Sequence, residues 1–163
     1  MQYDIPGGAY AQTDDVPAYL GYLKGHLAVF PAYMGGLSPE RLLERPAPGK
    51  WSRLEILGHL VDSATYNLTR FTRTPLEPSP YILQSYPQVE LVRVNRYQEL
   101  PSGHVLTLWE GLNRQIVFVI EGLTPAQLAL GVQLRDGSPV SLGWLFCDYV
   151  AHLEHHLQQV YRR

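Results

Sequence analysis

Apolar side chains recur every three or four residues in four long stretches of the chain, which is the spacing of an amphipathic helix. In the first stretch, Asp14 and Asp15 are candidate N-caps, and Gly35-Gly36 is expected to end the helix. Pro31 is expected to kink or shorten this helix. The repeating apolar positions are Tyr19, Leu20, Leu23, Leu27 and Phe30.

The second stretch begins with an unusually complete set of helix-start signals. Ser52 and Glu55 have the spacing of a capping box. Trp51 and Ile56 occupy the two positions of a hydrophobic staple, which fixes the direction in which the chain enters a helix. The helix is predicted to run to about Arg73.

Two more long helices are predicted in the C-terminal half of the chain. One has Ser102 as its candidate N-cap and keeps a 3.6-residue apolar period, and the other is capped by Ser141 and runs to about Tyr161. Between them, Asp136-Gly137 is a turn signal for a small hairpin over residues 132–140.

The two halves of the chain share a sequence pattern. Residues 36–42 and 122–128 each contain Gly-Leu-(Ser/Thr)-Pro, and each follows a long helix and precedes a serine-capped helix with a His-Leu pair. This pattern favours two helical hairpins, and therefore an all-α four-helix bundle. Residues 74–100 contain four prolines and are predicted to form a long, irregular crossover with some helix near Val89. Residues 1–13 are predicted to be an irregular arm.

Composition narrows the classes of function. The length of 163 residues favours a single domain spanning residues 1–163. The net charge of −2 argues against a nucleic-acid partner, and the small-molecule substrate considered below is implied by a family resemblance. Neither a targeting signal nor a membrane-spanning apolar run is seen, which makes the cytoplasm the expected location. The single cysteine, Cys147, excludes an internal disulfide and CxxC zinc motifs, so any metal ligands must be nitrogen or oxygen atoms.

Histidine is the more informative residue type. His152, His155 and His156 fall within five residues, and on a helical wheel His152 and His156 face the bundle while His155 faces solvent. An i, i+4 pair on one face can bind one metal ion, but it can also consist of partly buried, hydrogen-bonded histidines. His26 and His104 are interpreted as surface or structural residues.

Periodicity alone assigns other candidate residues to the outside of the bundle. His59 lies on the polar face of its helix and is predicted to be exposed. Cys147 falls on the outer side of the last helix and is interpreted as inert. Asp148, one turn before His152, is either a partner for that imidazole or a solvated surface charge.

Two sequence motifs together suggest a family. Residues 49–52 read Gly-Lys-Trp-Ser, and His59 opens a run H-x-x-D-S-x-x-x-N-x-x-R-F that ends at Phe71. Residues 152–156 read H-x-x-H-H near the chain end. These motifs resemble the DinB superfamily, most closely its YfiT-like branch. The resemblance covers residues 14–161 but is poor over residues 75–100.

The resemblance implies a four-helix bundle, often a homodimer, with a divalent metal, typically zinc or nickel, bound by His59, His152 and His156. It therefore overrides the exposed assignment of His59. Some members of the superfamily are S-transferases that use a low-molecular-weight thiol such as bacillithiol, mycothiol or glutathione. A three-histidine site leaves the metal with positive charge to ionise a bound thiol or water.

Three hypotheses of function follow. The first is a metal-dependent thiol S-transferase acting on small electrophiles, with Asp62, Tyr66 and Arg70 as candidates for the pocket wall or for supporting contacts. The second is a hydrolase using metal-bound hydroxide, for which Glu55, Asp62 or Glu154 could be the general acid or base. The third is a non-enzymatic, stress-associated helical-bundle protein.

Overall fold

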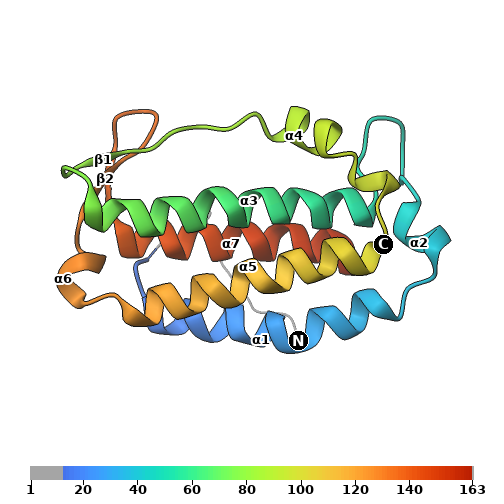
Figure 1. Cartoon of the computed structure of the whole chain (residues 1–163), viewed down its shortest axis with the longest axis horizontal. Helices are drawn as coiled ribbons and strands as arrows, with labels where there is room; N and C mark the ends of the chain where they lie inside the picture. Colours follow the sequence, from blue (N-terminus) through green and yellow to red (C-terminus); the bar gives the residue numbers. More distant parts are fainter. Residues whose placement is uncertain (1–12, 163) are drawn as a thin grey trace.

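The computed structural model describes residues 13–162, and its main feature is a bundle of four long helices (Figure 1). These are α1 (Val16–Gly35), α3 (Arg53–Arg73), α5 (Ser102–Gly122) and α7 (Leu142–Tyr161). Helices α3 and α5 run in the same direction and α1 and α7 run in the opposite one, so a long crossover must return the chain between α3 and α5 (Figure 1). The predicted four-helix bundle with its crossover is confirmed. The predicted arm at residues 1–13 lies, apart from its last residue, outside the described part of the chain.

Side-chain caps fix where most of the helices begin. Asp15, Ser38, Ser52, Thr124 and Ser141 each accept a hydrogen bond from a backbone N–H in the first turn of the helix that follows. The capping box and its position were both predicted, and Ser52 and Glu55 form it in the structure.

Two helix details differ from the prediction. Helix α1 continues through Pro31 to Gly35, so the proline does not shorten it. A proline inside a helix removes one backbone hydrogen bond, and the packing of Phe30 and Met34 in the core holds the last turn in place. Ser102 is the first residue of α5 and makes no side-chain cap, because Pro101 occupies the N-cap position.

The short elements lie in the connections between the long helices. The first connection holds α2 (Pro39–Leu43). The crossover holds η1 (Thr74–Leu76), β1 (Tyr81–Ile82), α4 (Gln88–Asn95) and η2 (Tyr97–Glu99). Before α7 come α6 (Pro125–Leu128), β2 (Gly131–Gln133) and β3 (Pro139–Ser141).

A small sheet joins the crossover to the hairpin that precedes α7. Strands β2 and β3 are antiparallel, as the turn at Asp136-Gly137 predicted, and β1 pairs in parallel with β2. The backbone N–H of Leu83 extends this pairing by donating to the carbonyl of Gln133 (3.0 Å). The sheet therefore fixes the first half of the crossover against the end of the bundle (Figure 1).

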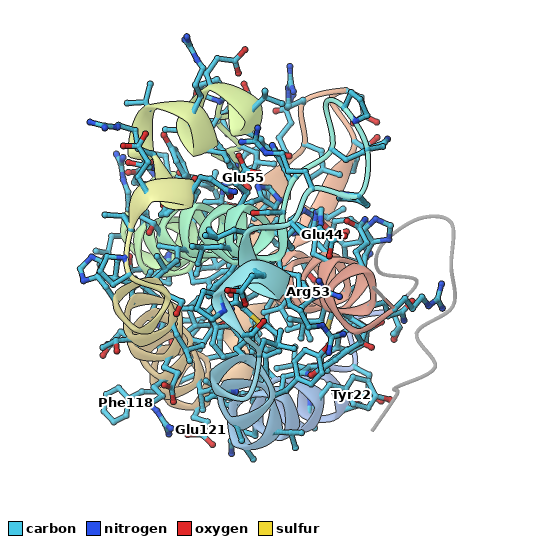
Figure 2. The ribbon with its side chains drawn as sticks, turned by 90° about the vertical axis from the view of Figure 1, so that its right-hand side faces the viewer. Tyr22, Glu44, Arg53, Glu55, Phe118 and Glu121 are labelled. Atoms are coloured by element: carbon cyan, nitrogen blue, oxygen red, sulfur yellow. The ribbon has the colours of Figure 1, made fainter. Side chains whose placement is uncertain are left out.

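The core fills the space between the four long helices, with Phe30, Phe71, Trp109 and Phe146 fully buried. Seen end on, the bundle also carries the second half of the crossover as an outer layer over α3 (Figure 2). At the same end, Arg53 donates hydrogen bonds to the carbonyls of Arg41 (2.8 Å) and Val160 (3.2 Å), which ties the start of α3 to the end of α7. None of the helices in residues 13–162 is both long and apolar enough to cross a membrane.

Candidate metal centre

Three histidines from two helices meet inside the bundle. His59 comes from α3, and His152 and His156 come from successive turns of α7. Each histidine contributes one ring nitrogen to the cluster, and these three nitrogens all lie within 4.8 Å of one another. Nε2 of His59 is 3.3 Å from Nε2 of His152. Among the described residues this is the one group of three or more histidine, cysteine or acidic side chains close enough to hold a metal ion.

The buried position of His59 corrects the assignment made from periodicity. Its exposed fraction is 0%, although it lies on the polar face of α3. The prediction assumed that this face is open to water, but Trp51 and the histidines of α7 lie against His59, and α4 and η2 of the crossover also pack on α3. As a result, every residue from Arg53 to Ala64 is buried, and the helix has no solvent face over this length.

Burial keeps all three imidazoles neutral. It lowers the pKa of His59 to about 4. Burial, together with the neighbouring imidazoles, lowers the pKa of His156 to about 3 and that of His152 to about 2. A neutral imidazole is the form that binds a metal through a nitrogen lone pair. The cluster is therefore in its metal-binding protonation state at neutral pH.

The geometry of the cluster fits a small divalent ion. Two nitrogen ligands on a tetrahedral zinc ion, each about 2.0–2.1 Å from the metal, lie about 3.3 Å apart. This matches the 3.3 Å between the Nε2 atoms of His59 and His152. The Nδ1 atoms of His59 and His156 are buried and lack a hydrogen-bond partner within residues 13–162.

Two neighbours hold the rings in place. The indole of Trp51 lies against the imidazole of His59, with ring centres 5.0 Å apart and planes 34° apart. For His152 on α7, the neighbour is Ser63 of α3, whose Oγ lies 3.5 Å from Nδ1 of His152, on the side of that ring away from His59. Such a contact fixes which nitrogen of His152 carries the proton and leaves Nε2 free to bind a metal.

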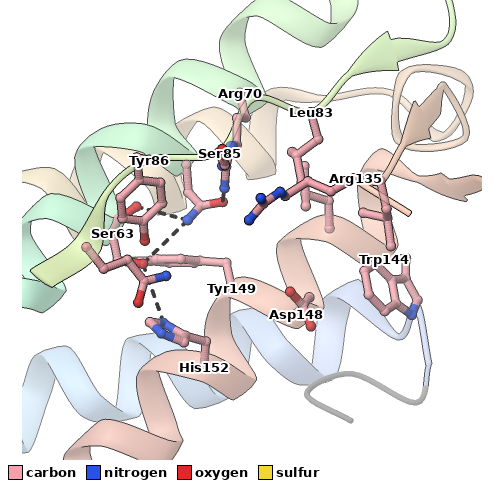
Figure 3. A pocket seen from close by; sticks show the side chains of 14 residues that line it. Ser63, Arg70, Leu83, Ser85, Tyr86, Arg135, Trp144, Asp148, Tyr149 and His152 are labelled. Carbon is pink, nitrogen blue, oxygen red and sulfur yellow. Dashed lines mark hydrogen bonds between the residues drawn. The ribbon is translucent and has the colours of Figure 1, made fainter. Parts of the chain in front are cut away.

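A pocket of about 210 Å³ adjoins the cluster and includes His152 in its wall. One side comes from α3 and α7, and the other comes from the crossover and the hairpin turn (Figure 3). Its lining residues are Ser63, Asn67, Arg70, Leu83, Ser85, Tyr86, Gln88, Leu134, Arg135, Trp144, Leu145, Asp148, Tyr149 and His152. The crossover, whose role the sequence leaves open, therefore forms one wall of the pocket.

The candidate pocket residues divide into two groups. Arg70 and Asp148 line the pocket, and Asp148 is half-buried rather than a fully solvated charge. Asp62 and Tyr66 do not line it. Asp62 instead accepts hydrogen bonds from the Tyr97 hydroxyl (2.7 Å) and Asn95 (2.9 Å), and burial raises its pKa despite these bonds. The ring of Tyr66 stacks on Tyr86, with centres 4.2 Å apart, and so supports a pocket residue from behind.

Several pocket residues were missed at the level of sequence. Tyr86 lies in the proline-rich crossover and Arg135 lies at a hairpin turn, and neither region has a periodicity that assigns a direction to a side chain. The Asp136-Gly137 turn signal did locate the hairpin. Nothing in the pattern indicates that the arginine before it points toward the bundle.

The carboxylates considered for acid–base chemistry are paired elsewhere. Glu55 accepts two hydrogen bonds from Arg45 and one from the Ser52 backbone, and these bonds lower its pKa although burial opposes them. The carboxylate of Glu154 lies against Nε2 of His26 in a buried contact between α7 and α1. His26 is therefore structural, which is one of the two roles predicted for it.

Cys147 is buried, which corrects its predicted place on the outer side of the last helix. The start of α1 and the residues before it cover that side, since Tyr19, Asp14 and Asp15 all lie near enough to interact with the thiol. Burial raises the pKa of Cys147 to about 12. The thiol was predicted to be inert on the outer side of the helix, whereas in the structure its burial is what keeps it protonated.

A sequence profile of the DinB superfamily matches residues 22–160, which is most of the chain. The chain belongs to the DinB superfamily. A search of curated proteins found no match.

Solved structures confirm the DinB-type fold. YfiT from Bacillus subtilis, described as a probable metal-dependent hydrolase with an unusual four-helix bundle topology, superposes with a TM-score of 0.78. The sequences are 18% identical, and the match covers 99% of this chain and 93% of YfiT. A mycothiol-dependent maleylpyruvate isomerase matches with a TM-score of 0.67 and 11% identity, over 93% of this chain and 62% of that longer one. At these identities the likeness concerns the fold.

Proposed function

We propose that His59, His152 and His156 hold a divalent metal ion, zinc or nickel, and that the protein is an enzyme acting on a small molecule. The observation that carries the proposal is the convergence of three neutral imidazoles beside a pocket that includes one of them. A divalent ion held by three imidazoles keeps its positive charge and lowers the pKa of a thiol or water molecule bound at an open position.

The preferred reaction is transfer of a low-molecular-weight thiol to a small electrophile. The thiol releases its proton to solvent, its sulfur forms a bond to the electrophilic carbon, and the leaving group departs with the electrons of its own bond. The chain provides no nucleophile for this step, because its one thiol, Cys147, is buried and protonated. A mycothiol-dependent enzyme with the same fold supports a thiol that enters from solution.

The pocket residues have distinct parts in this proposal. Ser63 orients His152, and Trp51 covers the face of His59. The buried side chain of Leu145 and the half-buried side chain of Trp144 limit the water in the pocket, which strengthens electrostatic contacts there. The substrate lies between these helices and the wall made by the crossover.

A hydrolase is the second candidate, and one observation favours it. Asp148 lies in the pocket wall one helical turn before His152, where a carboxylate could take a proton from water. YfiT, with the same fold, is described as a probable metal-dependent hydrolase.

The two reactions are separated by assaying the metal-loaded protein in matched buffers. We expect conjugation of a model electrophile in the presence of bacillithiol, mycothiol or glutathione, no conjugation by His152→Ala, and full conjugation by His155→Ala, whose side chain is exposed. Ester or amide hydrolysis in thiol-free buffer, with no conjugation, would establish the hydrolase instead. Absence of both activities in fully metal-loaded protein would leave a non-enzymatic bundle protein.

A further inference from the structure

The pocket beside His152 carries an excess of positive charge. Two guanidinium groups, those of Arg70 and Arg135, and one carboxylate, that of Asp148, line it. The other Asp, Glu, Lys and Arg side chains of residues 13–162 lie outside this lining. The pocket is therefore suited to a negatively charged ligand.

Arg70 is held in a fixed position and still has hydrogen-bonding capacity. Its guanidinium donates to the carbonyl of Gln84 (2.5 Å) and to Oδ1 of Asn67 (3.2 Å), and it lies 5.5 Å from the ring centre of Tyr86. A guanidinium has five N–H donors. Three of them donate no hydrogen bond within the described residues, although Asp148 interacts with the group through its charge. A held arginine with unused donors is organised to bind an anion.

Arg135 approaches from the opposite side of the pocket. Its side chain extends from the turn between β2 and β3 toward Arg70 (Figure 3). Within residues 13–162 it makes no hydrogen bond or ion pair, and its side chain is exposed. Two guanidinium groups that point toward one another repel, and an anion between them removes this repulsion.

The size and remaining walls of the pocket indicate a small organic molecule. A volume of about 210 Å³ corresponds to roughly seven water molecules at about 30 Å³ each. Leu83, Leu134, Leu145 and Trp144 supply apolar surface for a short carbon skeleton. An inorganic anion alone would leave this apolar surface unused.

We propose that Arg70 and Arg135 form a carboxylate-binding subsite, and that the substrate of this protein is a small organic acid. A carboxylate fits the planar, forked donors of arginine, and the charge-assisted bonds are the strong ones. The inference rests on the proposed function, in that the pocket beside the histidine cluster is the substrate site. It adds the chemical class of the molecule bound there.

The test measures binding to the metal-free full chain by titration calorimetry at low ionic strength. The probes are succinate, its uncharged analogue succinamide, and inorganic phosphate. We expect succinate to bind and succinamide to bind at least about tenfold more weakly, since bonds to charged groups are the stronger ones. Equal binding of the two, no binding of succinate, or tighter binding of phosphate than of succinate would overturn the proposal.

Substitutions locate the subsite. Arg135→Gln is expected to weaken succinate binding by about tenfold or more, and Arg135→Lys is expected to weaken it less. Because Arg135 lies in an exposed turn, its replacement leaves the helices intact, whereas Arg70→Gln is checked for folding by circular dichroism. The matched control is Arg93→Gln, because Arg93 is an exposed arginine of α4 that lies outside the pocket. This variant should bind succinate like the wild type. Unchanged succinate binding in Arg135→Gln would contradict the proposal.

The carboxylate can belong to the electrophile or to the thiol, and two further titrations of metal-loaded protein distinguish these sources. If it belongs to the electrophile, succinate and the carboxylate-free thiol cysteamine should bind together. If it belongs to the thiol, glutathione should displace succinate. Either result supports the subsite. If Arg135→Gln weakens the binding of neither succinate nor glutathione, the subsite is contradicted.

The metal-free measurement separates this inference from the proposed function. Loss of carboxylate selectivity with an intact metal site would remove the subsite and leave the metal-dependent enzyme. Retained carboxylate selectivity in a wild-type protein that binds no metal would keep the subsite and contradict the metal-dependent enzyme.

Discussion

The ring of Tyr97 occupies the space that a side chain on Gly58 would need. A Cβ added at Gly58 would lie 2.1 Å from both Cγ and Cδ2 of Tyr97. This close approach brings η2 onto α3 and places the Tyr97 hydroxyl 2.7 Å from Oδ1 of Asp62. The crossover is therefore seated on α3, next in sequence to His59, by a contact that only glycine permits.

Gly58→Ala is expected to destabilise the protein because the Tyr97 ring must move. Overpacking of this kind costs about 1–3 kcal/mol. Gly111→Ala is the matched control, since a Cβ added there in α5 meets nothing within 4 Å. It should stabilise the protein by about 0.5–1 kcal/mol, the helix-interior difference between glycine and alanine. Urea denaturation measures both variants, and equal changes of the same sign would contradict the packing argument.

Replacement of any one of His59, His152 or His156 by alanine is expected to abolish stoichiometric metal binding. Each removes one of the three proposed ligands, and the remaining two cannot enclose the ion. His155→Ala, in the same sequence cluster but with an exposed side chain, should bind metal like the wild type. Plasma mass spectrometry of protein dialysed against zinc or nickel gives the metal content. Full metal content in His59→Ala would rule out the three-histidine site.

Ser63→Ala tests the supporting contact to His152. Loss of the Oγ atom, 3.5 Å from Nδ1 of His152, removes the group that orients the ring. Loss of such a contact lowers metal affinity by about 10–100-fold. Competition with a chromogenic chelator measures the affinity. Thr65→Ala, which replaces an exposed hydroxyl on the same helix, should leave it unchanged.

The thiol of Cys147 is expected to be unreactive in the folded protein. Burial raises its pKa to about 12, compared with about 8.5 for a free cysteine. Labelling by Ellman's reagent should therefore stay slow between about pH 7 and pH 9 and become rapid when guanidinium unfolds the chain. Rapid labelling of folded protein at neutral pH would contradict the buried position.

The same pKa shift gives the sign of a stability effect. Because the folded pKa of the thiol lies above its unfolded value, its contribution to stability is fully present below about pH 8.5. It is lost as pH rises from there toward about 12. The difference in unfolding free energy between wild type and Cys147→Ala should therefore shift against the wild type as pH rises above about 9.

The helices were predictable because their signals are local. The caps at Ser52 and Ser141 depend on side chains within three residues of the backbone groups they bond, and both are confirmed. The wheel for α7 correctly turned His152 and His156 toward the bundle and His155 outward. These three positions depend only on one helix and one buried face.

Burial by a distant segment was not predictable from periodicity. His59 and Cys147 both lie on helix faces that a helical wheel assigns to solvent. Each is buried by segments that are distant in the sequence or have no periodic pattern. The family motif, rather than any pattern, selected His59. Arg135 has neither kind of signal, because an isolated charge at a turn carries no periodicity.

The histidine cluster and the pocket wall opposite it belong to different kinds of structure. The cluster is carried by two packed helices, whereas Leu83, Ser85, Tyr86 and Arg135 lie on connecting segments outside the four long helices. Connecting segments accept substitutions and insertions that packed helices do not. In this architecture, the lining of the pocket can therefore diverge through changes in two loops, while the bundle and the proposed metal centre that it carries stay the same.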